Sequence, residues 1–155
     1  MKVCVLTVSD RAFRGEYEDL SGPGIEKILV EELPEAEIRR VVVPDENEKL
    51  TRAFEDASDC DFILTTGGTG LGPRDITPEA TARWCERELP GISELLRAES
   101  YRETKHAVLS RGYAGVKGKT LVVNFPGSVK GAEFCTRVLL PVMEHAVSML
   151  SGGGH

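Results

Sequence analysis

Short apolar segments alternate with longer segments of helical periodicity along this chain. Predominantly apolar runs of strand length predict buried parallel strands, at Val3–Val8, Ile38–Val43, Phe62–Thr66 and Thr120–Phe125. The segments between them predict helices, at Ser21 to about Leu33, Asn47–Ala57, Thr77 to about Glu88, Ile92–Thr104 and Lys130 to about Leu150. Strands that alternate with helices in this way predict an α/β fold with a mainly parallel sheet and helices on both faces.

Capping residues and prolines mark the predicted helix ends. Ser21 is a predicted N-cap, Pro34 ends the first helix, and Thr77 caps the helix that Pro78 opens. Pro141 lies inside the last helix and predicts a kink or a break. The glycines between 112 and 118 predict an irregular stretch. We expect residues 1–150 to form a single domain and residues 151–155 to be a disordered tail.

Composition limits the classes of protein and partner. The chain has 155 residues and a net charge of −6, which does not indicate a nucleic-acid-binding protein. No apolar run approaches the ~20 residues of a membrane-spanning helix, and the N-terminal segment is too short for a signal peptide. We therefore expect no membrane partner and a cytoplasmic location. The widely spaced cysteines favour apolar core positions over zinc ligands or disulfides, at Cys4, Cys60, Cys85 and Cys135.

A glycine-rich loop between a strand and a helix is the most informative motif. The strand Phe62–Thr66 runs into Gly67, Gly68, Thr69 and Gly70, and the loop ends in Arg74 and Asp75. Glycines let the backbone approach a ligand closely and turn its N–H groups toward an anion. Strand–loop–helix segments of this kind bind phosphates in α/β proteins.

The loops that follow the other strands also carry polar groups. Ser9, Asp10 and Arg11 follow the first strand, Asp45 follows the second, and Pro126, Gly127 and Ser128 follow the last. Ligands gather at the carboxyl ends of parallel strands, so these groups are expected to converge at one edge of the sheet. Carboxylates that hold Mg²⁺, with N–H groups and arginines that hold phosphates, would make a Mg²⁺–nucleotide site.

Each of these groups has a structural alternative. Asp45 would serve equally well as a helix cap, and Asp75 as a turn residue. The loop Ser9–Arg11 would accommodate a local ion pair, and Ser128 would suit an N-cap. Arg74 would suit a solvated surface position.

Taken together, the motifs resemble a known family. The run Thr66–Gly70, followed by Arg74-Asp75-Ile76-Thr77-Pro78, is similar to the molybdenum-cofactor biosynthesis family, which includes the bacterial MogA and MoaB proteins and the G domain of gephyrin. Further matching segments occur in the same order over essentially the whole chain, at Val8–Arg11, Val43–Glu46, Glu88–Gly91, Leu109–Arg111 and Asn124–Gly127. Phe125 stands where many relatives have leucine, a change of packing rather than of chemistry.

The resemblance implies a fold, an assembly and an activity. It implies a three-layer α/β/α sandwich, usually a homotrimer and sometimes a hexamer. The implied reaction is adenylylation of molybdopterin by Mg·ATP with release of pyrophosphate, before molybdate or tungstate insertion and with possible handover to an insertion protein. The alternative is a non-catalytic molybdopterin-binding carrier of the MoaB type.

The resemblance also assigns roles to residues. Asp45 and Asp75 match the family's essential aspartates and are the expected catalytic residues and Mg²⁺ ligands. The segment Gly67–Gly70, together with Arg74, is the expected nucleotide-binding part. Substrate-binding roles are expected for Ser9, Asp10, Arg11, Pro126, Gly127 and Ser128.

Overall fold

A six-stranded sheet forms the centre of the molecule, and the computed structural model describes residues 1–153. The strands are β1 (Lys2–Val8), β2 (Glu37–Val43), β3 (Phe62–Thr66), β4 (Arg87–Glu88), β5 (Ala114–Lys117) and β6 (Thr120–Phe125). Their order across the sheet is β2-β1-β3-β6-β5-β4. The neighbours from β2 to β6 are parallel, whereas β5 is antiparallel to β6 and to β4.

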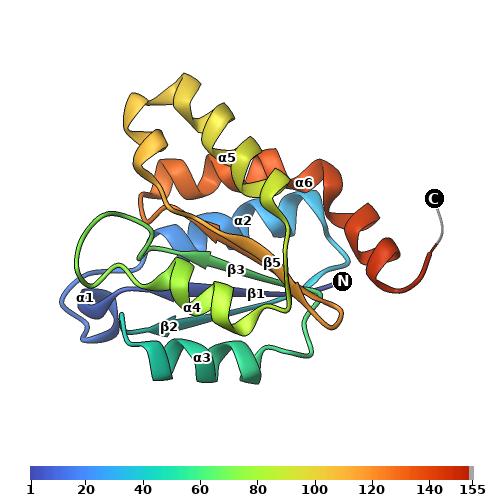
Figure 1. Ribbon diagram of the computed structural model, residues 1–155, viewed down its shortest axis with the longest axis horizontal. Helices are drawn as coiled ribbons and strands as arrows, with labels where there is room; N and C mark the ends of the chain where they lie inside the picture. The colour runs from blue at the N-terminus through green and yellow to red at the C-terminus, as the bar shows by residue number, and fades with distance from the viewer. Residues whose placement is uncertain (154–155) are drawn as a thin grey trace.

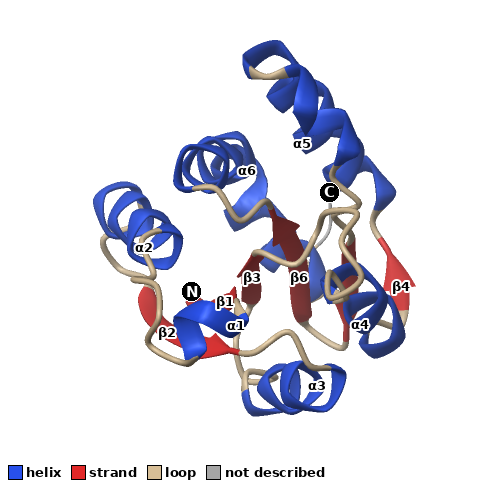
Figure 2. Ribbon diagram, turned by 90° about the vertical axis from the view of Figure 1, so that its left-hand side faces the viewer, coloured by secondary structure: helices blue, strands red, loops and turns tan. Residues whose placement is uncertain are grey.

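Helices cover both faces of the sheet. The longer ones are α2 (Ser21–Glu32), α3 (Asn47–Asp56), α4 (Thr77–Trp84), α5 (Pro90–Glu103) and α6 (Val129–Leu150). Figure 2 shows α2, α5 and α6 on one side of the sheet and α3 and α4 on the other. The short helices α1 (Asp10–Phe13) and η1 (Lys105–Leu109) complete the set. The predicted three-layer α/β/α sandwich with a mainly parallel sheet is therefore confirmed (Figure 1).

Two hydrophobic clusters hold the layers together, because alternate side chains of a strand point to opposite faces. In β1, Val3 and Val5 belong to the cluster under α2 and α6, whereas Cys4 and Leu6 belong to the cluster under α3 and α4. The central strands β3 and β6 are buried along their whole length. This two-sided burial explains why these strands read as continuous apolar runs.

The chain departs from the predicted elements between Cys85 and Lys117. The helix predicted to reach Glu88 ends at Trp84, and the chain then enters β4. The stretch predicted to be irregular contains β5, which pairs with β6 in a hairpin. Backbone bonds from Glu86 N to Val116 O and from Leu89 N to Ala114 O hold this edge, so long-range pairing outweighs the local helix preference.

The helix caps differ in part from those predicted. Ser21 is the first residue of α2 rather than its cap, and the Asp19 carboxylate accepts the Gly22 N–H at 3.0 Å instead. Thr77 begins α4, but its hydroxyl has no hydrogen-bond partner among the described residues. Ser128 caps α6 as predicted by accepting the Gly131 N–H. The helix continues to Leu150, so Pro141 does not break it.

The last helical turn continues into hydrogen-bonded backbone. The N–H groups of Gly152 and Gly153 donate to Met149 and Ser148. The remainder of the tail predicted to be disordered, residues 154–155, lies outside the described residues. Within residues 1–153, no helix is both long and apolar enough to cross a membrane.

Candidate active site

The largest cavity lies beside the carboxyl ends of β3 and β6 and has a volume of about 580 Å³. The glycine loop forms one part of its wall through Gly68, Thr69 and Gly70, and the carboxylate residue Asp75 follows in the same loop. The turn after β6 contributes Pro126, Gly127 and Ser128. Seven predicted site residues from two distant parts of the sequence therefore line one cavity.

The glycine loop presents free backbone donors to this space. Within residues 1–153, the backbone N–H groups of Gly68, Thr69 and Gly70 donate to no protein acceptor. At the start of α6, Ser128 accepts the Gly131 N–H, and the N–H groups of Val129 and Lys130 have no partner within the helix. Both segments line the cavity, so its wall suits an anionic ligand such as a phosphate.

The Asp75 carboxylate folds back over its own loop. Its Oδ2 accepts the Gly72 N–H at 2.9 Å, and the Asp75 N–H donates to Gly72 O. The same oxygen lies 2.9 Å from the position that a Cβ would take on Gly70. Asp75 therefore closes a turn, as its structural alternative predicts, and it is also part of the cavity lining.

A second cavity lies on the other side of Gly67 and Gly127. It has a volume of about 230 Å³, and Ser9 and Arg11 are part of its lining. The Arg11 guanidinium lies over the Tyr17 ring, 5.1 Å from the centroid, and Ser9 caps α1 by accepting the Ala12 N–H. Gly127 lines both cavities, so this residue lies between the two spaces.

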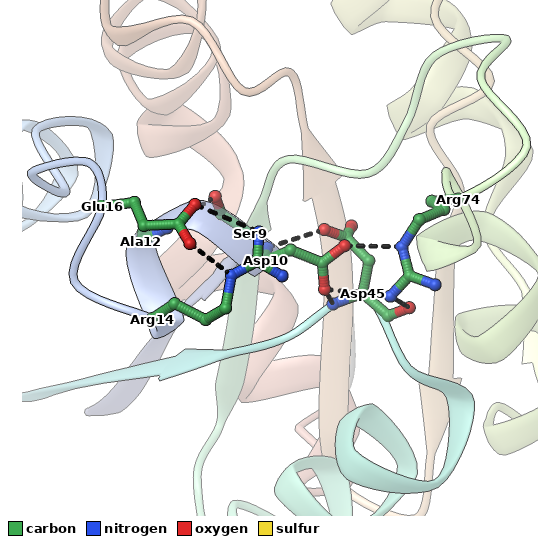
Figure 3. A network of polar contacts seen from close by, with 7 residues as sticks. All are labelled: Ser9, Asp10, Ala12, Arg14, Glu16, Asp45 and Arg74. Atoms are coloured by element: carbon green, nitrogen blue, oxygen red, sulfur yellow. Dashed lines mark hydrogen bonds and ion pairs between the residues drawn. The ribbon is translucent and has the colours of Figure 1, made fainter.

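Asp10, Asp45 and Arg74 form a network outside the main cavity (Figure 3). The Asp10 N–H donates to Asp45 Oδ2 at 2.9 Å, and the Asp45 N–H donates to Asp10 Oδ1 at 3.0 Å. Arg74 donates to both oxygens of Asp10 and to the Asp45 carbonyl. The ion pair of Asp10 therefore joins two loops that are far apart in the sequence, and Asp45 orders the end of β2 without capping α3, whose N-cap is Glu46.

The two aspartates of this network have opposite pKa shifts. The Arg74 guanidinium lowers the pKa of Asp10 by hydrogen bonding to its charged form. Burial raises the pKa of Asp45, and the negative charges of Asp10 and Asp75 act in the same direction. Asp45 Oδ1 lies 3.2 Å from the position that a Cβ would take on Gly68, so this carboxylate faces the glycine loop.

The donor set fits a magnesium ion that is shared with a ligand. Among residues 1–153, no group of three or more His, Cys, Asp or Glu side chains is arranged to bind a metal on its own. Asp45 Oδ1 nevertheless lies near the Cβ position of Gly68 and Asp75 Oδ2 near that of Gly70, and the negative charge of Asp75 helps to raise the pKa of Asp45. Mg²⁺ typically takes one or two carboxylates and completes its shell with waters and phosphate oxygens, and this pair meets that requirement.

Several lining residues were not singled out from the sequence. The helix α5 lines the cavity with Ser93, Arg97 and Ser100, its C-cap Thr104 continues the row, and His106 follows from η1. The first four of these residues are three or four positions apart, which places them on one face of a helix. A row of polar residues at this spacing was the feature of the sequence that could have indicated this wall of the cavity. Arg111 also contacts the glycine loop, and nothing local in the sequence indicates that contact.

Comparison with known proteins is consistent with this geometry. The model of a family described as "Probable molybdopterin binding domain" matches residues 4–145. A molybdopterin adenylyltransferase of Helicobacter pylori is 41% identical over 152 residues, which cover 96% of this chain and 86% of that protein. The Escherichia coli protein of the same name is 35% identical and covers 84% of this chain and 69% of its own.

Solved structures show the same similarity in three dimensions. The crystal structure of the molybdopterin biosynthesis enzyme MoaB from Thermus thermophilus has a TM-score of 0.88 at 45% identity and covers 97% of this chain and 96% of its own. A tungsten cofactor synthesizing MoaB from Pyrococcus furiosus has a TM-score of 0.84 at 35% identity, with 96% of each chain covered. On these matches the chain belongs to the molybdopterin-binding family of molybdenum-cofactor biosynthesis, which includes MogA and MoaB.

Proposed function

We propose that this protein is a molybdopterin adenylyltransferase, which transfers AMP from ATP to the terminal phosphate of molybdopterin and releases pyrophosphate. The observation that carries the proposal is the convergence of the glycine loop, Asp75 and the start of α6 on one cavity. The adenylyltransferase relatives, which match over most of this chain, support the same reaction.

In the proposed reaction the terminal phosphate of molybdopterin attacks the α-phosphorus of ATP in line. The bond from that phosphorus to the bridging oxygen breaks, and pyrophosphate leaves with the electron pair. Because the nucleophile is already an anion, the protein needs no general base. Its task is to position two phosphates and to offset their charge.

The residues of the chain divide this task between them. The free N–H groups of Gly68, Thr69 and Gly70 would bind phosphate oxygens of ATP, with Gly67 as the hinge of the loop. Arg74 holds Asp10 and the Asp45 carbonyl through Nε and Nη2, which leaves Nη1 to donate to a phosphate. Pro126, Gly127 and Ser128 would hold molybdopterin, with its phosphate at the N-terminus of α6.

The pocket on the far side of Gly127 extends the substrate site. Ser9 and Arg11 line it, and Asp10 connects it to the aspartate network. Asp45 and Asp75 would bind Mg²⁺ together with the phosphates. That ion would supply charge neutralisation of the ATP phosphates and of the departing pyrophosphate.

The test is pyrophosphate release from ATP, Mg²⁺ and molybdopterin. We expect release that depends on molybdopterin and falls about 100-fold or more in Asp75→Asn, because one charged group aimed at a transition state contributes this much. The asparagine keeps an oxygen that accepts the Gly72 N–H, so the loop should stay folded. Asp56→Asn is the matched control, because Asp56 is an exposed residue of α3 outside the lining of the cavity. Wild-type turnover in Asp75→Asn would refute the assignment.

The second candidate is a carrier that binds molybdopterin without turnover. The description of the matching family model names molybdopterin binding and no reaction, and this observation favours the carrier as the second candidate. Tight molybdopterin binding with no ATP-dependent pyrophosphate release, in protein shown to be folded, would establish the carrier.

We also propose that the protein acts in the cytoplasm as a homo-oligomer, a trimer or a hexamer, and hands its product to a metal-insertion protein. Leu71 and Leu109 support association, because both line the cavity and are 70% and 52% exposed. A second copy that covers them would shield the cavity from water. Sedimentation equilibrium measures the assembly, and a monomer at micromolar concentration would contradict this part of the proposal.

A further inference from the structure

Arg111 binds the glycine loop at three residues. It follows η1, and its own N–H donates to Thr69 O at 2.8 Å. Its guanidinium donates through Nε to Gly70 O at 2.8 Å and through Nη2 to Asp75 O at 2.7 Å. Nη1 pairs with the Glu79 carboxylate in α4. One residue thus contacts the loop at Thr69 and Gly70, at its last residue Asp75, and at the helix that follows.

Apart from Arg111, two sets of contacts hold the loop between Thr69 and Asp75. One is the pair of hydrogen bonds between Gly72 and Asp75, and the other is the binding of the Arg74 side chain to Asp10 and the Asp45 carbonyl. Glycines lose the most conformational freedom on ordering, so a loop rich in glycine needs ties from outside to hold one shape. Arg111 supplies such ties at three carbonyl oxygens.

These contacts also connect two walls of the cavity. Leu109, Ser110 and Gly112 line one side, and the segment from Gly68 to Leu71 lines another. Arg111 lies between Ser110 and Gly112 in the chain and bonds across to the second wall. The distance between the walls is therefore set in part by the reach of one guanidinium.

The guanidinium binds the protein through all three of its nitrogens. Each nitrogen donates one hydrogen bond to a protein oxygen, and one of these acceptors is the Glu79 carboxylate. The planar fork of arginine matches several acceptors at once, whereas lysine offers a single ammonium. Arg111 is thus suited to shaping the loop.

We propose that Arg111 is a positioning residue that orders the glycine loop and fixes the backbone of Asp75 relative to residues 109–112. For its catalytic consequence this inference rests on the proposed adenylyl transfer. The structural part, the tie between residues 109–112 and the loop, stands independently of which reaction the site performs.

The first measurement is amide hydrogen exchange of the ligand-free protein. We expect the Gly72 and Asp75 amides to exchange about 10-fold faster in Arg111→Gln, because two charge-assisted bonds to the loop are lost. The amides of β3 should exchange as in the wild type, because the core is untouched. Arg102→Gln is the matched control, since Arg102 has a single pair with Glu99 and a side chain that is 75% exposed.

The second measurement is turnover in Arg111→Gln and Arg111→Lys. A small misplacement at a reacting centre costs about 100-fold, so we expect kcat to fall by about that factor in both variants. A lysine keeps the charge but loses the fork, and it should recover no more than about threefold. Recovery of wild-type kcat by lysine would show that charge and not geometry matters, and would overturn the inference.

The outcomes separate this inference from the proposed function. If the loop amides of Arg111→Gln exchange at the wild-type rate, Arg111 does not order the loop, whatever the activity. If they exchange faster but kcat is unchanged, Arg111 has no catalytic consequence. If the wild type releases no pyrophosphate, the proposed reaction is wrong. Amide hydrogen exchange then still shows whether Arg111 orders the loop. Should Arg111→Gln fail to fold, Arg111→Lys supplies the exchange comparison.

Discussion

Gly67→Ala tests how tightly the start of the glycine loop is packed. Gly67 has φ of +100°, a conformation that residues with a side chain rarely adopt. A Cβ at this position would lie 3.4 Å from the carbonyl carbon of Val8 and well inside van der Waals contact with its oxygen. The obstacle is the backbone at the end of β1, which cannot move aside as a side chain can.

The expected cost has two parts. A positive φ costs an alanine about 1–2 kcal/mol relative to glycine. Crowding in a well-packed region typically costs a further ~1–3 kcal/mol. We therefore expect Gly67→Ala to lower the free energy of unfolding by about 2–5 kcal/mol, less any gain from a stiffer unfolded chain.

Two other glycines separate these parts. Gly118 also has a positive φ, +57°, but nothing lies within 4 Å of its Cβ position. Gly118→Ala should therefore cost only the conformational part, about 1–2 kcal/mol. Gly91 lies in the first turn of α5 with open space around it, so Gly91→Ala should be neutral or stabilise by up to ~1 kcal/mol.

Urea unfolding at neutral pH measures all three variants. We expect Gly67→Ala to be the least stable of the three variants, Gly118→Ala to be intermediate and Gly91→Ala to be the most stable. A difference under about 0.5 kcal/mol between Gly67→Ala and Gly118→Ala would refute it, because crowding of at least ~1 kcal/mol should separate them. In a folded Gly67→Ala protein we also expect pyrophosphate release to fall, since the loop would start from a displaced position.

Three further predictions follow from single contacts. Ser128→Ala removes the N-cap of α6 and should cost about 1 kcal/mol in urea unfolding, with a higher KM for molybdopterin because Ser128 lines the cavity. Asp10→Asn should cost about 1 kcal/mol at pH 7. Because the pKa of Asp10 is lowered in the folded protein, this stabilisation is fully present above the pKa of Asp10 in the unfolded chain. It disappears as the pH falls through the pKa of Asp10 in the folded protein. The free energies of unfolding of the wild type and of Asp10→Asn should therefore converge in acid. Burial raises the pKa of Cys85 to about 11, so at pH 8 native Cys85 should react with iodoacetamide about two orders of magnitude more slowly than in urea; equal rates would contradict the burial.

The central strands could be predicted because burial on both faces leaves a strong signal. The runs in β1, β3 and β6 are mostly apolar, and the structure buries every position of them except Lys2. The strands at the β4 edge of the sheet were harder to predict, because β5 is four residues long and contains Gly115. A Cβ there would lie 2.8 Å from Arg87 O, so the glycine that weakens the local strand signal is what allows β4 to pair.

The site residues are also of two kinds, those that a local sequence motif indicates and those that only long-range contacts bring together. The glycine loop and Asp75 are adjacent in sequence, so their motif is visible before any fold is known. Asp45 could be placed at the sheet edge from the strand order, but its reciprocal bonds with Asp10 join residues 35 positions apart. Side chains that lock such partners together have no fixed spacing, and only the fold brings them into contact.

Arg111 shows what this means for locating functional residues. Its guanidinium binds two backbone carbonyls that lie 36 and 41 positions earlier in the chain, and the residue type of such an acceptor carries no information about the contact. A motif search finds groups that touch a ligand, because chemistry restricts their type and spacing. The groups that hold those motifs in shape are restricted by geometry alone. If loop order limits the reaction, substitutions at Arg111 should impair it nearly as much as substitutions at Asp75, although only Asp75 presents a carboxylate to the cavity.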